Sequence, residues 1–161
     1  MIVTECTIQA ILMQWCMSDK HHSLVVPNST SIYSWESDLL SVTRCNFVHE
    51  YEIKLNMADY RRDALKESKH YYLKTERSKY LPNYFWYATF EFDIEPPVYA
   101  GWLKVVYSAK HFRYYIEIKK EAPRLHTFKL TNDKILAFGR LLAWRVTNEY
   151  SKRIFVNKGV D

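Results

Sequence analysis

Apolar and polar residues alternate most regularly between residues 35 and 70, where the pattern predicts two strands joined by a tight turn and then a helix. Residues 44–46 are typical of a three-residue turn, because Asn46 tolerates a left-handed backbone. This turn sets the register of the two strands, and counting outward from it places Asp38 directly opposite Glu52. The second strand carries its charged residues on one face: Glu50, Glu52 and Lys54.

The predicted pairing of Asp38 with Glu52 has a chemical consequence. Carboxylates opposite each other on a sheet repel, at a cost of up to roughly 1 kcal/mol, and a hard cation such as Mg²⁺ removes this repulsion by taking their oxygens as ligands. Lys54 lies two residues after Glu52 and projects to the same side. The metal would lower the pKa of a bound water and the ammonium would position or activate it, which suits phosphodiester hydrolysis.

An ordinary solvated strand face is the alternative interpretation of the same residues. Glu-x-Lys is common in strands, and a second copy stands at Glu117–Lys119 without an acidic residue on an obvious partner strand. A slip of one residue in the register would also move Asp38 to the other face of the sheet. Spacing therefore leaves catalysis and a solvated face both open.

An ordered set of motifs adds to this pattern. Ser37-Asp38, followed by Glu52-Ile53-Lys54, resembles the signature of the PD-(D/E)xK nuclease superfamily, with Ser37 where the family usually has proline. Within that superfamily, the chain is similar to the MmcB-like DNA-repair proteins and their phage-encoded relatives. The likeness covers roughly residues 4 to 126 and includes an early helix with Glu5 and these later segments: Asp59-Tyr60…Asp63, residues 83–87 and residues 122–126.

The resemblance implies a metal-dependent nuclease fold and a role for each matched residue. It implies that Asp38 and Glu52 bind Mg²⁺ or Mn²⁺ together with the carbonyl of Ile53. Lys54 would act on the attacking water or on the transition state. Glu5 would face the metal directly or through water, although a carboxylate in the first turn of a helix is equally explained by the helix dipole.

A second helix is predicted from Met57 to about Thr75, with Asn56 as its cap. Acidic and basic residues recur along one edge of this helix at the spacing of successive turns. The edge is either solvated, with local Asp–Lys pairs, or it binds phosphates while Asp59 and Asp63 orient the basic residues. The candidate nucleic-acid-binding residues are Arg61, Arg62, Lys66, Lys69 and His70.

The remaining pattern predicts one domain over residues 1–161, of the α/β (α+β) class. We expect a mixed central sheet flanked by helices, in the order α-β-β-β-α-β-β-β-α, and the resemblance implies that this sheet is restriction-endonuclease-like. The aromatic run at residues 83–90 is typical of a central strand covered on both faces, and Ile154–Val156 suggest a loose terminal strand. The other expected elements are a helix to about Met17 capped by Thr4, strands at 23–27, 101–107 and 112–120, and a last helix from Thr131 to about Tyr150.

Composition narrows the class of protein. The chain has 161 residues, with 48% hydrophobic and 25% charged residues, which is ordinary for a globular domain. Its net charge of +5 favours a polyanionic partner such as DNA. The three cysteines show no zinc or disulfide spacing. Without a leader or a long apolar run, we expect a cytoplasmic protein that does not enter membranes, and the sequence is compatible with a homodimer.

The leading hypothesis is Mg²⁺-dependent hydrolysis of DNA phosphodiester bonds, in repair, recombination or phage DNA processing. A structure-specific endonuclease is the first expectation, because the chain is small and lacks a recognition domain. An exonuclease is equally compatible with the motif. The alternative is a nucleic-acid-binding or assembly protein that keeps the fold without turnover.

Overall fold

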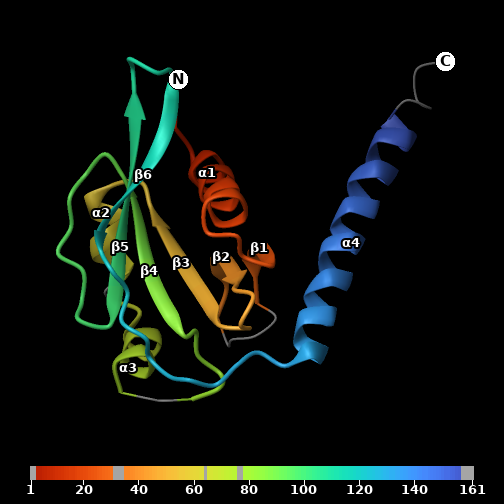
Figure 1. Cartoon of the computed structure of the whole chain (residues 1–161). Helices are drawn as coiled ribbons and strands as arrows, with labels where there is room; N and C mark the ends of the chain where they lie inside the picture. Colours follow the sequence, from red (N-terminus) through yellow and green to blue (C-terminus); the bar gives the residue numbers. More distant parts are fainter. Residues whose placement is uncertain (1–2, 31–34, 64, 76–77, 157–161) are drawn as a thin grey trace. The chain divides into compact units, whose positions relative to one another are not determined.

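The structure, a computed structural model, describes residues 3–30, 35–63, 65–75 and 78–156. The chain forms two compact units, Met1–Leu130 and Thr131–Asp161. The second unit is built on the helix α4 (Asn132–Val156). The first unit contains these elements (Figure 1): α1 (Glu5–Ser18), β1 (Leu24–Ser29), β2 (Ser37–Val42), β3 (Val48–Lys54), α2 (Met57–Asp63), α3 (Glu67–Thr75), β4 (Tyr84–Phe90), β5 (Ala100–Ser108) and β6 (Arg113–Lys120).

The six strands form one mixed sheet in which the spatial order β1-β2-β3-β4-β5-β6 follows the order along the chain. The outer pairs, β1–β2, β2–β3 and β5–β6, are antiparallel, whereas β3–β4 and β4–β5 are parallel. Parallel neighbours need a crossover, and α2 and α3 supply it between β3 and β4. The predicted α+β class and mixed central sheet are therefore confirmed.

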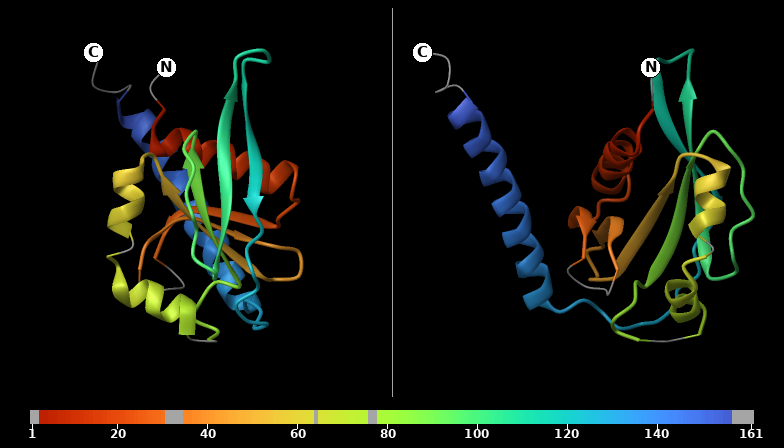
Figure 2. Two further views of the ribbon diagram at one scale, coloured as in Figure 1. Left: turned by 90° about the vertical axis from the view of Figure 1, so that its left-hand side faces the viewer. Right: turned by 180° about the vertical axis from the view of Figure 1, so that it is seen from behind.

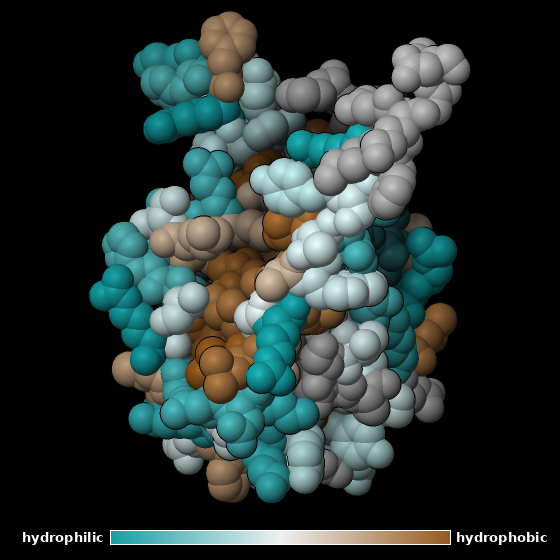
Figure 3. Space-filling model, turned by 90° about the vertical axis from the view of Figure 1, so that its right-hand side faces the viewer, coloured by the Kyte–Doolittle hydropathy of each residue, from teal (hydrophilic) through white to brown (hydrophobic). Residues whose placement is uncertain are grey.

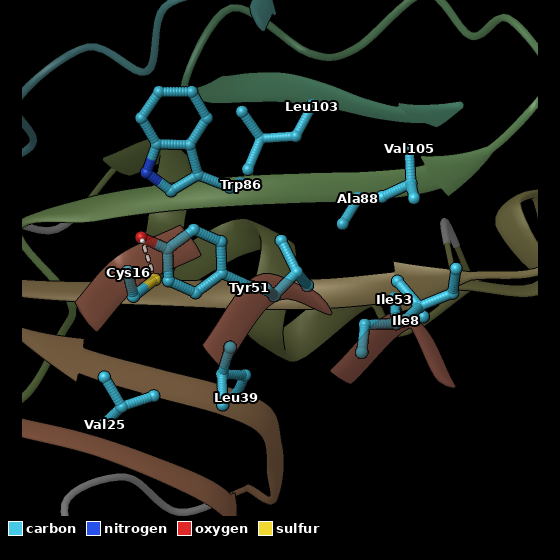
Figure 4. Close-up of a cluster of buried hydrophobic side chains, with 11 residues drawn as sticks. Ile8, Cys16, Val25, Leu39, Tyr51, Ile53, Trp86, Ala88, Leu103 and Val105 are labelled. Atoms are coloured by element: carbon cyan, nitrogen blue, oxygen red, sulfur yellow. Dashed lines mark hydrogen bonds between the residues drawn. The ribbon is translucent and has the colours of Figure 1, made fainter. Parts of the chain in front are cut away.

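One face of the sheet is apolar and packs against α1. Ile8, Leu12 and Cys16 recur at helical spacing and are fully buried against Tyr51 and Ile53 of β3, together with residues of β2, β4 and β5 (Figure 4). Thr4 caps the helix as predicted, because its side chain accepts a hydrogen bond from the Thr7 N–H. This apolar layer fixes β3, so that its alternate residues point to the opposite face.

The opposite face combines a second apolar cluster with a row of charged side chains. Leu73 of α3 packs there against Phe85 and Tyr87 of β4. β4 is buried along its centre, as the aromatic run predicted. Glu50, Glu52 and Lys54 of β3 share this face and are also buried, which requires them to be paired.

Two sequence predictions are corrected by the structure. The helix expected from Met57 to Thr75 is two helices, because α2 ends at Asp63 and the Lys66 N–H bonds to the Asp63 carbonyl in a turn before α3. The loose strand expected at Ile154–Val156 is the end of α4, which continues to Val156. Within the described parts of the chain, no helix is both long and apolar enough to cross a membrane.

Candidate active site

The predicted register of β2 and β3 is confirmed. Leu39 pairs with Tyr51 and Val42 with Val48, which is the same register that places Asp38 opposite Glu52. At the turn, Asn46 has the left-handed backbone that its sequence position predicted, with φ of 64°. This pairing brings Asp38, which precedes Leu39, next to the Glu52–Lys54 segment.

The Asp38 side chain contacts β3 through the backbone. Its Oδ2 accepts a hydrogen bond of 2.7 Å from the Ile53 N–H. Burial of Asp38 and the negative charge of Glu52 raise its pKa to about 7, with a smaller contribution from Glu5. The Ile53 N–H and the more distant Lys54 oppose this rise without cancelling it. Burial and the two neighbouring carboxylates, Glu52 and Glu5, therefore disfavour the ionised form of Asp38, and a bound cation would favour it.

Glu52 lies at the centre of a cluster of alternating charges. Its Oε1 accepts from Lys54 Nζ and Lys66 Nζ, both at 2.9 Å, and its Oε2 accepts from Lys69 Nζ at 2.6 Å. Burial raises the pKa of Glu52, but the Lys69 and Lys54 ammonium groups outweigh it and the pKa lies below its ordinary value. Glu52 is therefore ionised and charge-compensated, in contrast to Asp38.

Lys54 is held between two carboxylates. Its Nζ lies 2.9 Å from Glu52 Oε1 and 3.3 Å from Asp63 Oδ1, and only 5% of its side chain is exposed. Two acceptors restrict the ammonium to a small volume at the end of β3, where alternation along the strand predicted it. The position of a cationic donor at this site is thus fixed by both β3 and α2.

Asp63, the last residue of α2, organises the other side of the cluster. Its Oδ2 accepts from the Tyr87 hydroxyl at 2.8 Å and lies 3.1 Å from His70 Nε2. Its Oδ1 lies 2.9 Å from Lys66 Nζ. Burial opposes ionisation, but the bond from His70 and the neighbouring positive charges hold the pKa of Asp63 well below its ordinary value. Asp63 is therefore a buried anion, not part of a solvated helix edge.

Glu50 extends the cluster away from Asp38. Its Oε1 lies 2.8 Å from Lys69 Nζ and accepts from Trp35 Nε1 at 3.0 Å. Its Oε2 is buried without a hydrogen-bond partner among the described residues. Burial, only in part offset by Lys69, raises the pKa of Glu50. We call the six residues that these contacts join the charge cluster: Glu50, Glu52, Lys54, Asp63, Lys66 and Lys69.

The expected nucleic-acid-binding residues separate into exposed and interior groups. Arg61 and Arg62 are exposed on α2, and 53% of the Lys66 side chain is exposed. Lys69, by contrast, has 4% of its side chain exposed and bonds two carboxylates, so its place as a surface phosphate ligand is corrected. His70 is likewise mostly interior, because its Nδ1 and Nε2 face Tyr99 and Asp63.

The break between α2 and α3 explains why sequence reasoning misplaced Asp63, Lys69 and His70. A continuous helix would have put them along an outer edge, whereas α2 ends at Asp63 and Lys69 of α3 bonds Glu50 and Glu52 of β3. The aromatic run predicts Tyr87 only as a core residue, because no local pattern indicates that its hydroxyl bonds Asp63. Glu50 carried a usable signal, because it shares the alternating face of Glu52 and Lys54.

The carboxylates near Asp38 and Glu52 are the candidate ligands for a metal ion. Across the residues that the structure describes, no three His, Cys, Asp or Glu side chains are arranged to hold one. Mg²⁺, however, commonly takes only one or two carboxylates and keeps several waters. Asp38 and Glu52 supply two such carboxylates on neighbouring strands, and Glu5 is close enough to raise the Asp38 pKa. These oxygen donors fit a hard divalent cation, provided that Glu52 exchanges an ammonium partner for it.

Comparison with known proteins supports the fold. No family model and no curated protein matches this sequence. The chain is similar to a solved structure described as "SPO1766 protein of unknown function from Silicibacter pomeroyi", with a TM-score of 0.65 and 19% sequence identity, over 95% of this chain and 96% of that chain. At this identity the likeness concerns the fold alone.

Proposed function

We propose that this protein is a divalent-metal-dependent phosphodiesterase that hydrolyses DNA, on a PD-(D/E)xK-like arrangement of the sheet. The observation that carries the proposal is the meeting of Asp38 with Glu52-Ile53-Lys54 on adjacent strands, in the register that the sequence predicted. The combination of an electrostatically strained carboxylate, a second carboxylate and a fixed ammonium is suited to a phosphoryl group and its metal.

In this proposal, Asp38 and Glu52 would hold Mg²⁺ or Mn²⁺, with the Ile53 carbonyl as a further ligand and Glu5 acting directly or through water. The metal would supply Lewis-acid stabilisation of the phosphate and a bound water of lowered pKa. Lys54 donates hydrogen bonds from a position set by Glu52 and Asp63. As the water oxygen bonds to phosphorus and the ester P–O bond breaks, this ammonium would stabilise the negative charge that accumulates on the phosphate oxygens.

A second candidate function rests on the closure of the charge cluster. Both oxygens of Glu52 are already occupied by ammonium groups. A cluster that is neutral without metal is also what a protein would keep if it bound nucleic acid or a partner without turnover. The alternative is therefore a catalytically silent nucleic-acid-binding or assembly protein on the same fold.

The deciding experiment is a nuclease panel on single-stranded, duplex, flap and four-way-junction DNA, with Mg²⁺, with Mn²⁺ and with chelator. We expect metal-dependent cleavage, with branched DNA preferred, as for a structure-specific endonuclease. Exonuclease action would appear as shortening from labelled ends. DNA binding that is equal with and without metal, and without cleavage of any substrate, would favour the silent alternative.

A further inference from the structure

The β5–β6 hairpin projects beyond the end of the strands at which the candidate active site lies (Figure 2). In the parallel part of the sheet, Lys54 of β3 is in register with Thr89 of β4 and Lys104 of β5. β5 continues for four residues past this row, to Ser108, which corresponds to about 13 Å of extended chain. The hairpin therefore extends from the same end of the sheet as Lys54, two strands away from it.

The tip of the hairpin is exposed and basic. Ser108 pairs with Arg113, and the four residues between them form the turn. Residues 109–113 are all exposed, and the charged residues among them are basic. In the space-filling view of Figure 3, this projecting end is mainly hydrophilic, with hydrophobic surface at its extremity.

Phe112 is an unusual residue for such a tip. Its side chain is 84% exposed, and its φ of 49° lies in the left-handed region, which a bulky side chain rarely adopts. Both features oppose stability, since the ring stays in water and the backbone is strained. An aromatic side chain held out of a protein in this way, between cationic groups, has the form of a wedge for stacked bases.

A hollow of about 440 Å³ lies at the root of the hairpin, at the same end of the strands as Lys54 but on the apolar face of the sheet that packs against α1. Leu55, which follows Lys54, lines it on one side, and Tyr107 and Tyr114 of the hairpin line it on the other. Val3, two residues before Glu5, and Phe90 complete its apolar wall. The Tyr107 and Tyr114 ring centroids are 5.1 Å apart, so the hairpin root is braced by aromatic packing.

The lining of this hollow suits an unstacked nucleobase. Its volume falls in the range of small-molecule sites, and its lining residues other than Glu91 are aromatic or aliphatic. Its charged member is Glu91, whose Oε1 accepts from the Tyr107 N–H at 3.4 Å. A carboxylate at that place can also accept from the amino group of a base. Aromatic walls beside a basic strand are the general means by which proteins hold single-stranded nucleic acid.

We propose that the β5–β6 hairpin and the hollow at its root bind DNA that is unpaired next to the scissile phosphate. The hollow receives a splayed base, Phe112 stacks at the junction of paired and unpaired bases, and Lys110 and Arg113 contact the phosphates. The hairpin would thus set the preference for forked or branched DNA over plain duplex. The position of the scissile phosphate in this inference rests on the proposed function, whereas the binding role does not.

The test compares binding to a forked DNA and to a blunt duplex of the same sequence, by fluorescence anisotropy in chelator, where no cleavage occurs. The variants are Phe112→Ala and the double variant Lys110→Ala with Arg113→Ala. Phe128→Ala is the matched control, because Phe128 is 52% exposed but lies near Asn83, at the opposite edge of the sheet. All altered side chains are exposed, so thermal melts should be unchanged.

We expect the parent to bind the fork more tightly than the duplex, and Phe112→Ala to reduce this preference by roughly fivefold or more, as the loss of one stacked base predicts. The double variant should weaken binding to both DNAs and flatten its salt dependence. Phe128→Ala should behave as the parent. In a fork that carries the fluorescent base 2-aminopurine at the unpaired position, the parent should quench the fluorescence by stacking. Phe112→Ala should not quench it.

Four outcomes would overturn the inference: no fork preference in the parent, a preference unchanged by Phe112→Ala, equal losses in Phe128→Ala, or no DNA binding. A parent dimer that Phe112→Ala dissociates, seen by light scattering, would instead make the tip a contact between copies of this chain. The proposed function is tested separately. If binding depends on the hairpin but no metal-dependent cleavage occurs, the nuclease proposal is wrong and the binding role of the hairpin stands. If cleavage occurs but does not depend on the hairpin, the nuclease proposal stands and the role of the hairpin is wrong.

Discussion

The hydroxyl of Tyr87 donates a hydrogen bond of 2.8 Å to Asp63 Oδ2, and this contact ties the central strand β4 to the last residue of α2. Because Asp63 also faces Lys54, the Tyr87 hydroxyl donates to the carboxylate that pairs with the candidate catalytic ammonium. Asp63 is thus an anion held by the core of the protein, and its loss should be felt by the whole charge cluster.

We expect Asp63→Asn to lower the free energy of unfolding by about 3 kcal/mol, because it removes one of the two carboxylates that compensate the buried Lys54 ammonium. Tyr87→Phe removes one hydrogen bond to a charged group and should cost about 2 kcal/mol. Urea unfolding of the parent and the two variants measures both changes. An Asp63→Asn variant as stable as the parent would show that the cluster does not depend on this carboxylate.

The second prediction concerns catalysis. Asp38→Asn, Glu52→Gln and Lys54→Ala should each lower the cleavage rate at least about a hundredfold, and combining them should add little, because such residues act as a unit. The matched control is Glu117→Gln with Lys119→Ala, an exposed Glu-x-Lys pair on β6 whose ion pair is 2.6 Å long. The control should leave cleavage unchanged. Activity retained by Lys54→Ala and by one carboxylate variant would contradict the site.

The third prediction uses the raised pKa of Asp38. Folding disfavours its ionised form, so the metal-free protein should lose stability as the pH rises from about 4 to about 7. In chelator at pH 8, Asp38→Asn should therefore melt at least as high as the parent. Its free energy of unfolding should be larger by up to roughly 1 kcal/mol. At pH 4 this advantage should be absent, because the parent carboxyl is then protonated in the folded state.

Metal should reverse this comparison. Millimolar Mg²⁺ or Mn²⁺ should raise the melting temperature of the parent by binding only the folded state, and raise that of Asp38→Asn less. Thermal melts of both proteins at pH 8, with metal and with chelator, give all four values. A parent indifferent to metal, together with a less stable variant in chelator, would make Asp38 a structural acceptor for the Ile53 N–H.

The fourth prediction concerns binding to DNA. The affinity should fall steeply as salt rises, because phosphate contacts release counterions. Charge reversal at exposed positions, Arg62→Glu with Lys66→Glu, should weaken binding to all sequences alike, as measured by anisotropy titrations at several salt concentrations. Lys66 also bonds Glu52, so Arg61→Glu with Arg62→Glu gives a version that leaves the charge cluster intact. Affinity that is flat in salt would exclude phosphate contacts as its main source.

The fifth prediction concerns two histidines on the α1 side of the sheet. Burial lowers the pKa of His22 to about 4 and that of His49 to about 3. The unfolded chain protonates both near pH 6.5, whereas the folded protein resists, so stability should fall as the pH drops from about 6.5 towards 4. Asp38 acts with the opposite sign over this range, so the effect is best measured in the Asp38→Asn background.

In that background, His22→Gln should flatten the dependence of the unfolding free energy on pH between 6.5 and 4. Its side-chain amide can still contact the Ser41 hydroxyl, which lies 2.7 Å from His22 Nδ1 in the parent. Urea titrations at four or five pH values would follow the slope. An identical slope in the variant would mean that His22 is protonated equally in the folded and unfolded states.

The sequence was most informative where short-range rules apply. Alternation and one turn residue, Asn46, were enough to predict the register that brings Asp38 to Glu52, because a strand has a fixed period of two. The α2–α3 break was missed, because acidic and basic residues keep a helical spacing across it. The burial of Lys69 is a consequence of that break. No local sequence pattern predicts which end of a helix packs against the sheet.

The order of the sheet has a consequence for folding during synthesis. Because every strand lies next to its predecessor in the chain, β1, β2 and β3 can assemble before β4 has been made. Once β3 has formed, Asp38, Glu52 and Lys54 are already near one another, whereas Lys66 and then Lys69 of α3 follow later in the chain. In a nascent chain, the carboxylate of Glu52 would thus be exposed to water until α3 has been synthesised. Packing of α3 on β3 would then bury it.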